Sequence, residues 1–163
     1  MESSAGTPPS HPMRRRDRAL TEAEAHAVMA KAEWGVLATV DAEGWPYAVP
    51  VNHALVDGAL IIHCATAGHK LDNLAFNDQV SYCVVTEAET VPLELSTRYE
   101  SAVAFGRAVR LEDEDARRAA LRAFGERFAP QHLEQVDRGI GKDLFRTAVL
   151  RIDVERVTGK ARR

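Results

Sequence analysis

The chain has 163 residues, a length that suits one domain and allows roughly two-thirds of the unfolded surface to be buried around a single core. Its 21 lysines and arginines are outnumbered by 24 aspartates and glutamates, and the formal charge of -3 gives no basic excess for general nucleic-acid binding. With two cysteines in apolar runs, no apolar stretch of about 18 residues and no signal-peptide core, the sequence predicts a cytoplasmic protein without a disulfide framework or membrane segment.

The N-terminal segment differs in composition from the rest of the chain. Residues 1–12, MESSAGTPPSHP, are rich in serine and proline and have no apolar period, which predicts a disordered tail followed by one domain over residues 13–163. Four arginines lie within residues 14–18, where they form either a solvated entry to the fold or a contact for a ligand phosphate. Thr21 and Glu24 form a capping box, which predicts a first helix over residues 21–32.

Short apolar runs separated by turn residues then predict an antiparallel sheet. Strands are expected over residues 34–40, 45–55, 59–65, 79–87, 99–111 and 147–157. Residues 41–44 and 56–58 are hairpin turns, so neighbouring strands in the sequence are expected to pair. Residues 88–97 contain a proline and mixed signals, which favours a loop outside the sheet or at the mouth of a site. Gly106 is a plausible bulge where a barrel strand bends.

The C-terminal half contains the clearest helix. Asp113 is a good N-cap, and an apolar stripe follows it, so we expect a helix over residues 113–128 that packs on the barrel. Pro130 ends that helix. A short helix over residues 131–136 and a flexible joint at residues 139–141, Gly-Ile-Gly, are expected before the last strand.

Residues 59–77, ALIIHCATAGHKLDNLAFN, carry the strongest chemical signal. An apolar strand runs into a turn with a glycine and then into a short helix. Free backbone amides and the positive end of the helix dipole attract a phosphate at such a helix start. Gly68 allows close approach of the backbone, and Thr66 and Lys70 add a hydroxyl donor and a full charge. The alternative is a lysine that serves only solubility.

The order of several motifs resembles a known family. Residues 35–39 (GVLAT), a turn, residues 46–51 (PYAVPV) and residues 63–70 (HCATAGHK) together resemble the flavin-binding split-barrel family related to pyridoxamine 5'-phosphate oxidase. The likeness is nearest to the nitroimidazole-resistance branch and extends over about residues 13–160. It implies a mainly β fold: an antiparallel split β-barrel with peripheral helices that forms a homodimer, with FMN held between the two subunits.

The resemblance also implies a cofactor site. Backbone groups of residues 50–52 would face the flavin ring, and Ser101 and Arg107 would belong to the wall supplied by the partner subunit. Trp34 and Trp45 either cover the ring or fill the end of the barrel. The expected cofactor-binding residues are Pro50, Val51, Asn52, His63, Thr66, His69, Lys70 and Ser101.

His63 is the candidate catalytic residue, since it lies beside the phosphate turn, although a histidine satisfied within the core remains the alternative. If it faces a pocket, Ile61 and Ala65 share its face of the strand, whereas Ile62 and Cys64 face the other side. No metal is expected from His53, His63, His69 and Cys64, because no helical histidine pair, CxxC or carboxylate cluster accompanies them.

Side chains alone supply little catalytic chemistry. No GxSxG or GxxxxGK[ST] motif is present, and a thiol such as Cys64 in an apolar strand tends to be unreactive. Redox chemistry would then come from a cofactor. We expect an FMN-dependent oxidoreductase that passes electrons to a small acceptor such as a nitroaromatic compound, with a second copy of the chain as its partner and without nucleic acid or membrane.

Two other functions stay open. The first is a flavin or haem carrier or sensor without turnover. The second is pyridoxamine 5'-phosphate oxidase itself, which is disfavoured because the C-terminal VERVTGKARR shows no second phosphate site rich in arginine and histidine.

Overall fold

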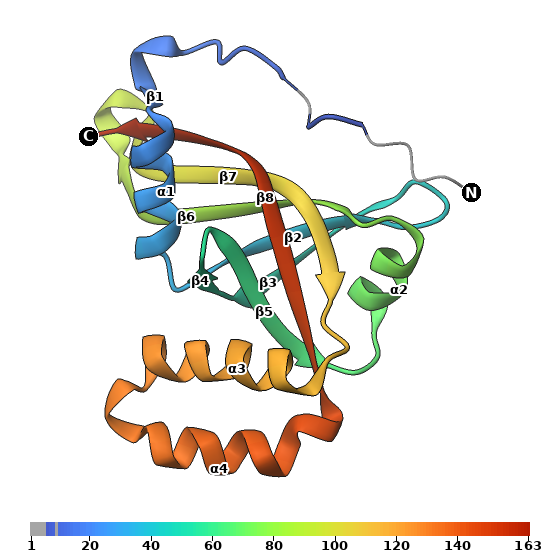
Figure 1. Cartoon of the computed structure of the whole chain (residues 1–163). Helices are drawn as coiled ribbons and strands as arrows, with labels where there is room; N and C mark the ends of the chain where they lie inside the picture. Colours follow the sequence, from blue (N-terminus) through green and yellow to red (C-terminus); the bar gives the residue numbers. More distant parts are fainter. Residues whose placement is uncertain (1–5, 9) are drawn as a thin grey trace.

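The computed structural model describes residues 6–8 and 10–163, so residues 1–5 and 9 of the predicted tail lie outside the described residues. One antiparallel sheet of eight strands forms a curled half-barrel (Figure 1), with the order β3-β2-β6-β7-β8-β5-β4 and with β1 paired to β8. The strands are β1 (Ala19–Leu20), β2 (Trp34–Val40), β3 (Pro46–Asn52), β4 (Ala54–Val56), β5 (Ala59–Ala65), β6 (Gln79–Val91), β7 (Ser96–Arg110) and β8 (Thr147–Arg162).

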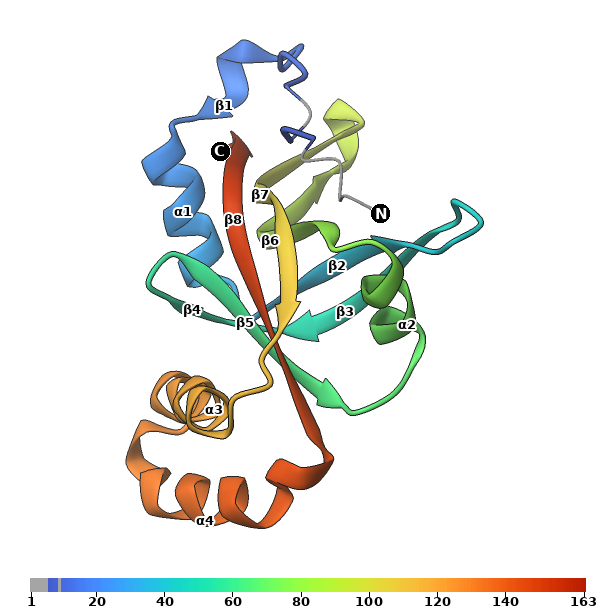
Figure 2. The ribbon, with the colours of Figure 1, turned by 45° about the vertical axis from the view of Figure 1, so that its right-hand side comes forward.

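The three longest strands, β6, β7 and β8, carry the curvature of the sheet (Figure 2). The register between β7 and β8 shifts between Phe105 and Gly106, which confirms the predicted bulge. A Cβ atom on Gly106 would lie 2.0 Å from the carbonyl oxygen of Asp153, so only glycine allows the two backbones to approach so closely. The β4–β5 hairpin turns through Asp57 and Gly58, both with positive φ, as the sequence predicts.

Helix α1 (Glu22–Lys31) packs against the inner face of β6, β7 and β8. The predicted capping box is present, because the Thr21 hydroxyl accepts the Glu24 amide while the Glu24 carboxylate accepts the Thr21 amide. Ala25, Val28 and Met29 are buried among core residues of the sheet. The helix therefore closes one side of the half-barrel.

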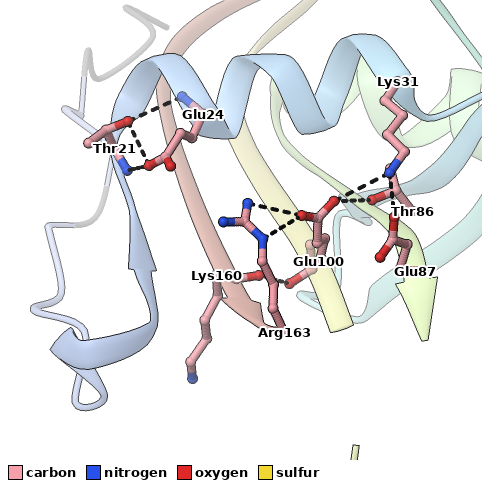
Figure 3. Close-up of polar contacts among 9 residues, drawn as sticks. Thr21, Glu24, Lys31, Thr86, Glu87, Glu100, Lys160 and Arg163 are labelled. Carbon is pink, nitrogen blue, oxygen red and sulfur yellow. Dashed lines mark hydrogen bonds and ion pairs between the residues drawn. The ribbon is translucent and has the colours of Figure 1, made fainter. Parts of the chain in front are cut away.

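A polar network fastens the C-terminal strand to α1 (Figure 3). The Glu100 carboxylate accepts the Arg163 guanidinium at 3.0 Å and lies 3.4 Å from the Lys31 ammonium, which also reaches Glu87 at 2.6 Å. These contacts lower the pKa of Glu100, with Arg163 as the main cause. The Lys31, Glu87 and Arg163 side chains are exposed, although Glu100 is only 13% exposed, so the network contributes more to alignment than to stability.

Three more helices complete the fold. Helix α2 (His69–Phe76) follows β5, helix α3 (Glu114–Phe128) lies over β4, β5 and β8, and helix α4 (Leu133–Asp143) packs on α3 (Figures 1 and 2). Phe124 and Ala120 of α3 form a small second core with Ile61 and Val149 of the sheet. Gly125 lets α4 approach, because an added Cβ would lie 2.5 Å from Val136.

Four sequence predictions were wrong in detail. The expected strand over residues 45–55 is broken into β3 and β4 at His53, whose side chain turns into the core. The expected loop over residues 88–97 is mostly strand, because the ends of β6 and β7 pair as far as Val91 and Ser96. The short helix expected over residues 131–136 continues through the supposed glycine joint, and the sheet has more strands than the six or so expected.

Trp34 and Trp45 are 55% and 72% exposed, so neither fills the end of the barrel.

The predicted helix over residues 113–128 is confirmed, with the Asp113 carboxylate accepting the Ala116 amide as an N-cap. In the described part of the chain, no helix has the length and apolar character needed to cross a membrane.

The close packing of β2 on β6 gives a first prediction. A Cβ on Gly35 would lie 2.6 Å from both the Cys83 carbonyl oxygen and the Tyr82 ring, so Gly35→Ala should lower the free energy of unfolding by about 1–3 kcal/mol. Gly139→Ala in α4 is the matched control, since its methyl group would meet no atom within 4 Å and should add up to about 1 kcal/mol. Urea unfolding followed by circular dichroism measures both, and equal stability of Gly35→Ala and wild type would contradict the packing.

Candidate functional site: the seam between β3 and β5

The half-barrel is open along one seam. Strand β3 lies at one end of the strand order and approaches β5, but no pairing between the two occurs in the described residues. Strand β5 instead pairs with β4 and β8. Because β4 pairs only with residues 59–61 of β5, residues 62–65 have a partner strand on one side alone. The seam therefore presents this free part of β5 and the outer edge of β3, whose backbone groups can meet a ligand.

The alternation along β5 is as predicted from the sequence. Ile62 and Cys64 point to the barrel interior, and Ile61 contributes to the second core under α3. The His63 ring faces the same helix, with its centroid 4.7 Å from that of Phe124 and the two rings nearly perpendicular. His63 therefore does not belong to the barrel core.

A cavity of about 440 Å³ lies between this face of β5 and the α3–α4 hairpin. Its wall is apolar except at two places, Asn52 at the end of β3 and His63. The Asn52 amide donates to the Glu33 carbonyl at 3.1 Å, which fixes its side chain. The lining residues are Asn52, His63, Leu121, Phe124, Gly125, Phe128, Ala129, Val136 and Ile140.

His63 is accessible from this cavity, yet its neighbours desolvate the ring enough to lower its pKa. The imidazole is therefore neutral at pH 7. A neutral imidazole offers one hydrogen-bond donor and one acceptor in a mostly apolar space. The cavity thus suits a flat, uncharged molecule with a single polar group directed at His63.

The turn before α2 lies at the other end of β3. Gly68 has a φ of 138°, a conformation that side chains disfavour, and its carbonyl accepts the amides of Leu71 and Asp72. The first amides of a helix have no partner within it, so those of His69 and Lys70 are available to an anion. The Tyr47 ring of β3 lies against the His69 ring with centroids 4.1 Å apart.

Lys70 forms no ion pair in the described part of the chain and has a charge free for a ligand. Its ammonium is near Cys64, where it opposes the effect of burial, which nevertheless raises the pKa of that thiol. Asn73, buried in the next turn, donates to the Thr39 hydroxyl at 2.9 Å and fixes α2 against β2. The start of α2 is thereby kept beside β2, one turn before this contact.

The two ends of the site are joined by a single strand. Tyr47 and Asn52 are five residues apart on β3, which corresponds to about 17 Å of extended chain. Pro50 is exposed and Val51 is half-buried between them. The seam can therefore accommodate an elongated ligand with a negative group at α2 and a flat apolar group beside Asn52 and His63.

Seven of the eight expected cofactor residues lie on β3, on β5, in the turn after β5 (Thr66) or at the start of α2, and Ser101 does not. Ser101 is on β7, two strands beyond β2, and its hydroxyl donates to the Lys160 carbonyl. Arg107, also on β7, pairs with Asp78 at 2.7 Å and with Glu155 at 3.2 Å beside a separate hollow of about 600 Å³.

Sequence reasoning missed two contributors. His53 is fully buried, with its Nε2 2.9 Å from the Met29 carbonyl and its Nδ1 3.0 Å from the Tyr82 hydroxyl. The apolar stripe of α3 was expected only to pack on the barrel, but it also lines the cavity. The one available signal for His53 is a polar residue directly after Asn52 within an otherwise apolar run.

A bulged antiparallel sheet that is left unpaired along one seam, with a helix that starts beside that seam, defines a split barrel. A family model described as pyridoxamine 5'-phosphate oxidase matches residues 21–161, so the chain belongs to that family. The family and the fold expected from the sequence are thereby confirmed. A search of curated proteins found no match.

Several solved structures share the fold. A flavocytochrome from Azotobacter vinelandii has a TM-score of 0.80 at 19% identity, over 94% of this chain and 73% of that one. An FAD and heme binding protein from Mycobacterium smegmatis has a TM-score of 0.75 at 25% identity, over 88% and 73%. A protein assigned as a 5-nitroimidazole antibiotic resistance protein from Bacteroides thetaiotaomicron has a TM-score of 0.72 at 23% identity, over 87% and 85%.

Proposed function

We propose that this chain is a flavin-dependent oxidoreductase that binds FMN along the seam and passes electrons to a small, uncharged acceptor. The observation that carries the proposal is the pairing of an anion-binding helix start with an apolar cavity at the two ends of β3. The similarity to an FAD and heme binding protein and to a flavocytochrome supports a flavin as the class of cofactor. FMN fits because its phosphate would bind at the start of α2 and its flat ring would lie beside the apolar cavity.

Each part of the site has a definite task in this proposal. Lys70, the Thr66 hydroxyl and the first amides of α2 hold the phosphate. Backbone groups of residues 50–52 orient the ring at the strand edge, and the bound flavin supplies the electron-transfer chemistry. The apolar side chains of α3 and α4 provide an apolar surface for the acceptor. His63, neutral in the cavity, hydrogen-bonds the acceptor and can give up or take a proton at its ring nitrogen.

The acceptor is small and mainly apolar, because apolar side chains form most of the cavity wall. A nitroaromatic ring meets this description, with its polar group toward His63. A flavin or haem carrier without turnover is the second candidate, favoured by the heme-binding similarity. Pyridoxamine 5'-phosphate oxidase activity ranks third, since no second phosphate site is evident near the C-terminus.

We also propose that the chain acts as a homodimer. Val36, Cys83 and Val103 lie opposite one another on the outer face of β2, β6 and β7, while α1 and α2 pack on the inner face. Residues 6–8 approach this outer face at the hollow beside Phe105. A second copy placed there would bring Ser101 and Arg107 toward the seam of its partner, which would reconcile their positions with a shared flavin site.

The optical spectrum and turnover of the purified protein test the function. Flavin absorption bands, and reoxidation of the reduced flavin by a nitroaromatic compound under anaerobic conditions, are the expected results. Flavin bands without reoxidation by any acceptor would indicate a carrier, and a Soret band would indicate haem. A colourless protein that does not bind added FMN would contradict both proposals, the oxidoreductase and the flavin carrier.

Lys70→Ala tests the phosphate end. A charge-assisted hydrogen bond is worth on the order of 1.5–3 kcal/mol, so the variant should bind FMN roughly ten- to a hundredfold more weakly by fluorescence titration. Thr66→Val should weaken binding about tenfold or less. Riboflavin, which lacks the phosphate, should bind wild type and Lys70→Ala almost equally. Unchanged FMN affinity, or an equal loss for riboflavin, would show that the phosphate is not held at α2.

Val85→Glu tests the dimer. Val85 is 47% exposed and lies on the same outer face as Cys83, so a carboxylate there should leave the fold intact and repel a second copy. We expect light scattering to show a dimer for wild type and a monomer with weakened FMN binding for the variant. Phe145→Glu, at an exposed position after α4, is the control. A wild-type monomer at micromolar concentration would refute the shared site.

A further inference from the structure

A buried hydrogen-bond relay lies behind β3. His53, with no exposed surface, places Nε2 2.9 Å from the Met29 carbonyl of α1 and Nδ1 3.0 Å from the Tyr82 hydroxyl of β6. The same hydroxyl lies 2.8 Å from the Val51 carbonyl, in the middle of the segment expected to meet the flavin ring. His53 is therefore connected to the backbone of β3 through one hydroxyl group.

The relay lacks a hydrogen when His53 is neutral. The carbonyls of Met29 and Val51 only accept, so Nε2 must donate to the first and Tyr82 to the second. The contact between Nδ1 and the Tyr82 oxygen then needs a third hydrogen, on Nδ1. A neutral imidazole carries only one hydrogen, and the imidazolium carries two. Only the charged ring satisfies all three contacts, and the neutral ring leaves one of them without a proton.

The surroundings of His53 oppose this charge. Burial is the largest influence and lowers the pKa of His53, and the Arg127 guanidinium of α3 lowers it further, whereas the Met29 carbonyl of α1 raises it. From β6, Tyr82 stays protonated because burial raises its pKa, although the Gly35 amide of β2 and the Arg127 guanidinium lower that pKa in part. None of these groups is a carboxylate that could balance a positive charge on the His53 ring. A negatively charged ligand at the seam would supply that counter-charge.

We propose that His53 and Tyr82 form a proton-dependent positioning pair for β3. With the imidazolium, the Tyr82 hydroxyl donates to the Val51 carbonyl and fixes the strand. With the neutral ring, the same hydroxyl turns to Nδ1 and releases that carbonyl, so the strand edge is held by β2 alone. The part of the inference that concerns the cofactor rests on the proposed function, whereas the relay itself does not.

The proposal links proton binding to ligand binding. If the fixed strand is the form that holds the flavin, FMN favours the imidazolium, and by reciprocity protonation of His53 strengthens FMN binding. The stability of the free protein follows the opposite sign. Because the pKa of His53 is lowered on folding, its contribution to stability is present above the ordinary pKa of histidine and is lost as the pH falls through the folded pKa.

The first experiment uses the protein without cofactor. NMR of the imidazole nitrogens should show that His53 takes up its proton at a lower pH in Tyr82→Phe than in wild type, by about half a unit to one unit, because the imidazolium has lost an acceptor. The phenylalanine ring keeps the packing over Gly35. An unchanged pKa of His53 in Tyr82→Phe would overturn the relay, whether or not the protein binds flavin.

The second experiment measures FMN affinity from pH 5 to pH 8 in wild type and in His53→Gln, whose amide can still donate to Met29 but does not titrate. The ratio of the two dissociation constants cancels the titration of the FMN phosphate itself. The variant should bind about two- to tenfold more weakly at pH 5, and the difference should vanish toward pH 8. His26→Gln, on the surface of α1, is the control and should match wild type throughout.

A ratio that does not change with pH would overturn the link between His53 and the cofactor strand. Failure of every variant and of wild type to bind FMN would instead overturn the proposed function, and the NMR titration would then decide the relay alone. Circular dichroism of His53→Gln establishes that it is folded before its affinity is compared.

Discussion

The structure of the site depends on how the C-terminus of α1 is capped. The last carbonyls of a helix have no partners within it. Here three carbonyls in the last turn of α1 and just after it accept hydrogen bonds from three side chains. Met29 meets the His53 ring, Ala32 the Arg127 guanidinium and Glu33 the Asn52 amide. These donors come from the end of β3, the residue that follows it and helix α3. One helix end therefore aligns α1 itself, strand β3 and the α3 wall of the cavity.

This capping explains why polar groups are buried behind an apolar cavity. A buried polar group without a partner costs about 1–3 kcal/mol, and the helix end would present several. The negative end of the helix dipole also favours the positive charge of Arg127. The arrangement is not fully satisfied, because the Arg127 Nε is buried without a partner and its charge disfavours a second one on His53. Two side chains that cap the same helix end, Arg127 and His53, therefore oppose each other when both are positively charged.

The parts of the fold that the sequence predicted are those fixed by neighbouring residues. The capping box of Thr21 and Glu24, the turn at Asp57 and Gly58 and the N-cap Asp113 each act within a few residues, as does the helix start at Gly68. The sequence also predicted the bulge at Gly106, because a glycine within a long strand commonly marks a bulge or a close approach of two backbones. The strand break at His53 was not predictable, because the atoms that turn its ring inward belong to Met29 and Tyr82, far along the chain. For the same reason α4, stabilised by contact with α3, continues past two glycines that locally disfavour a helix.

The same distinction divides the site into two halves. The proposed phosphate end is built from residues 66–70, so it could be inferred from one short motif. The apolar end needs β3, β5, α3 and α4 together, and its wall is set by residues more than fifty positions after His63. Substitutions in α3 and α4 can therefore change the shape of the cavity without disturbing the start of α2, where we propose that the phosphate binds. A scaffold of this kind can keep one class of cofactor while its acceptor changes, because different segments of the chain build the two ends of β3.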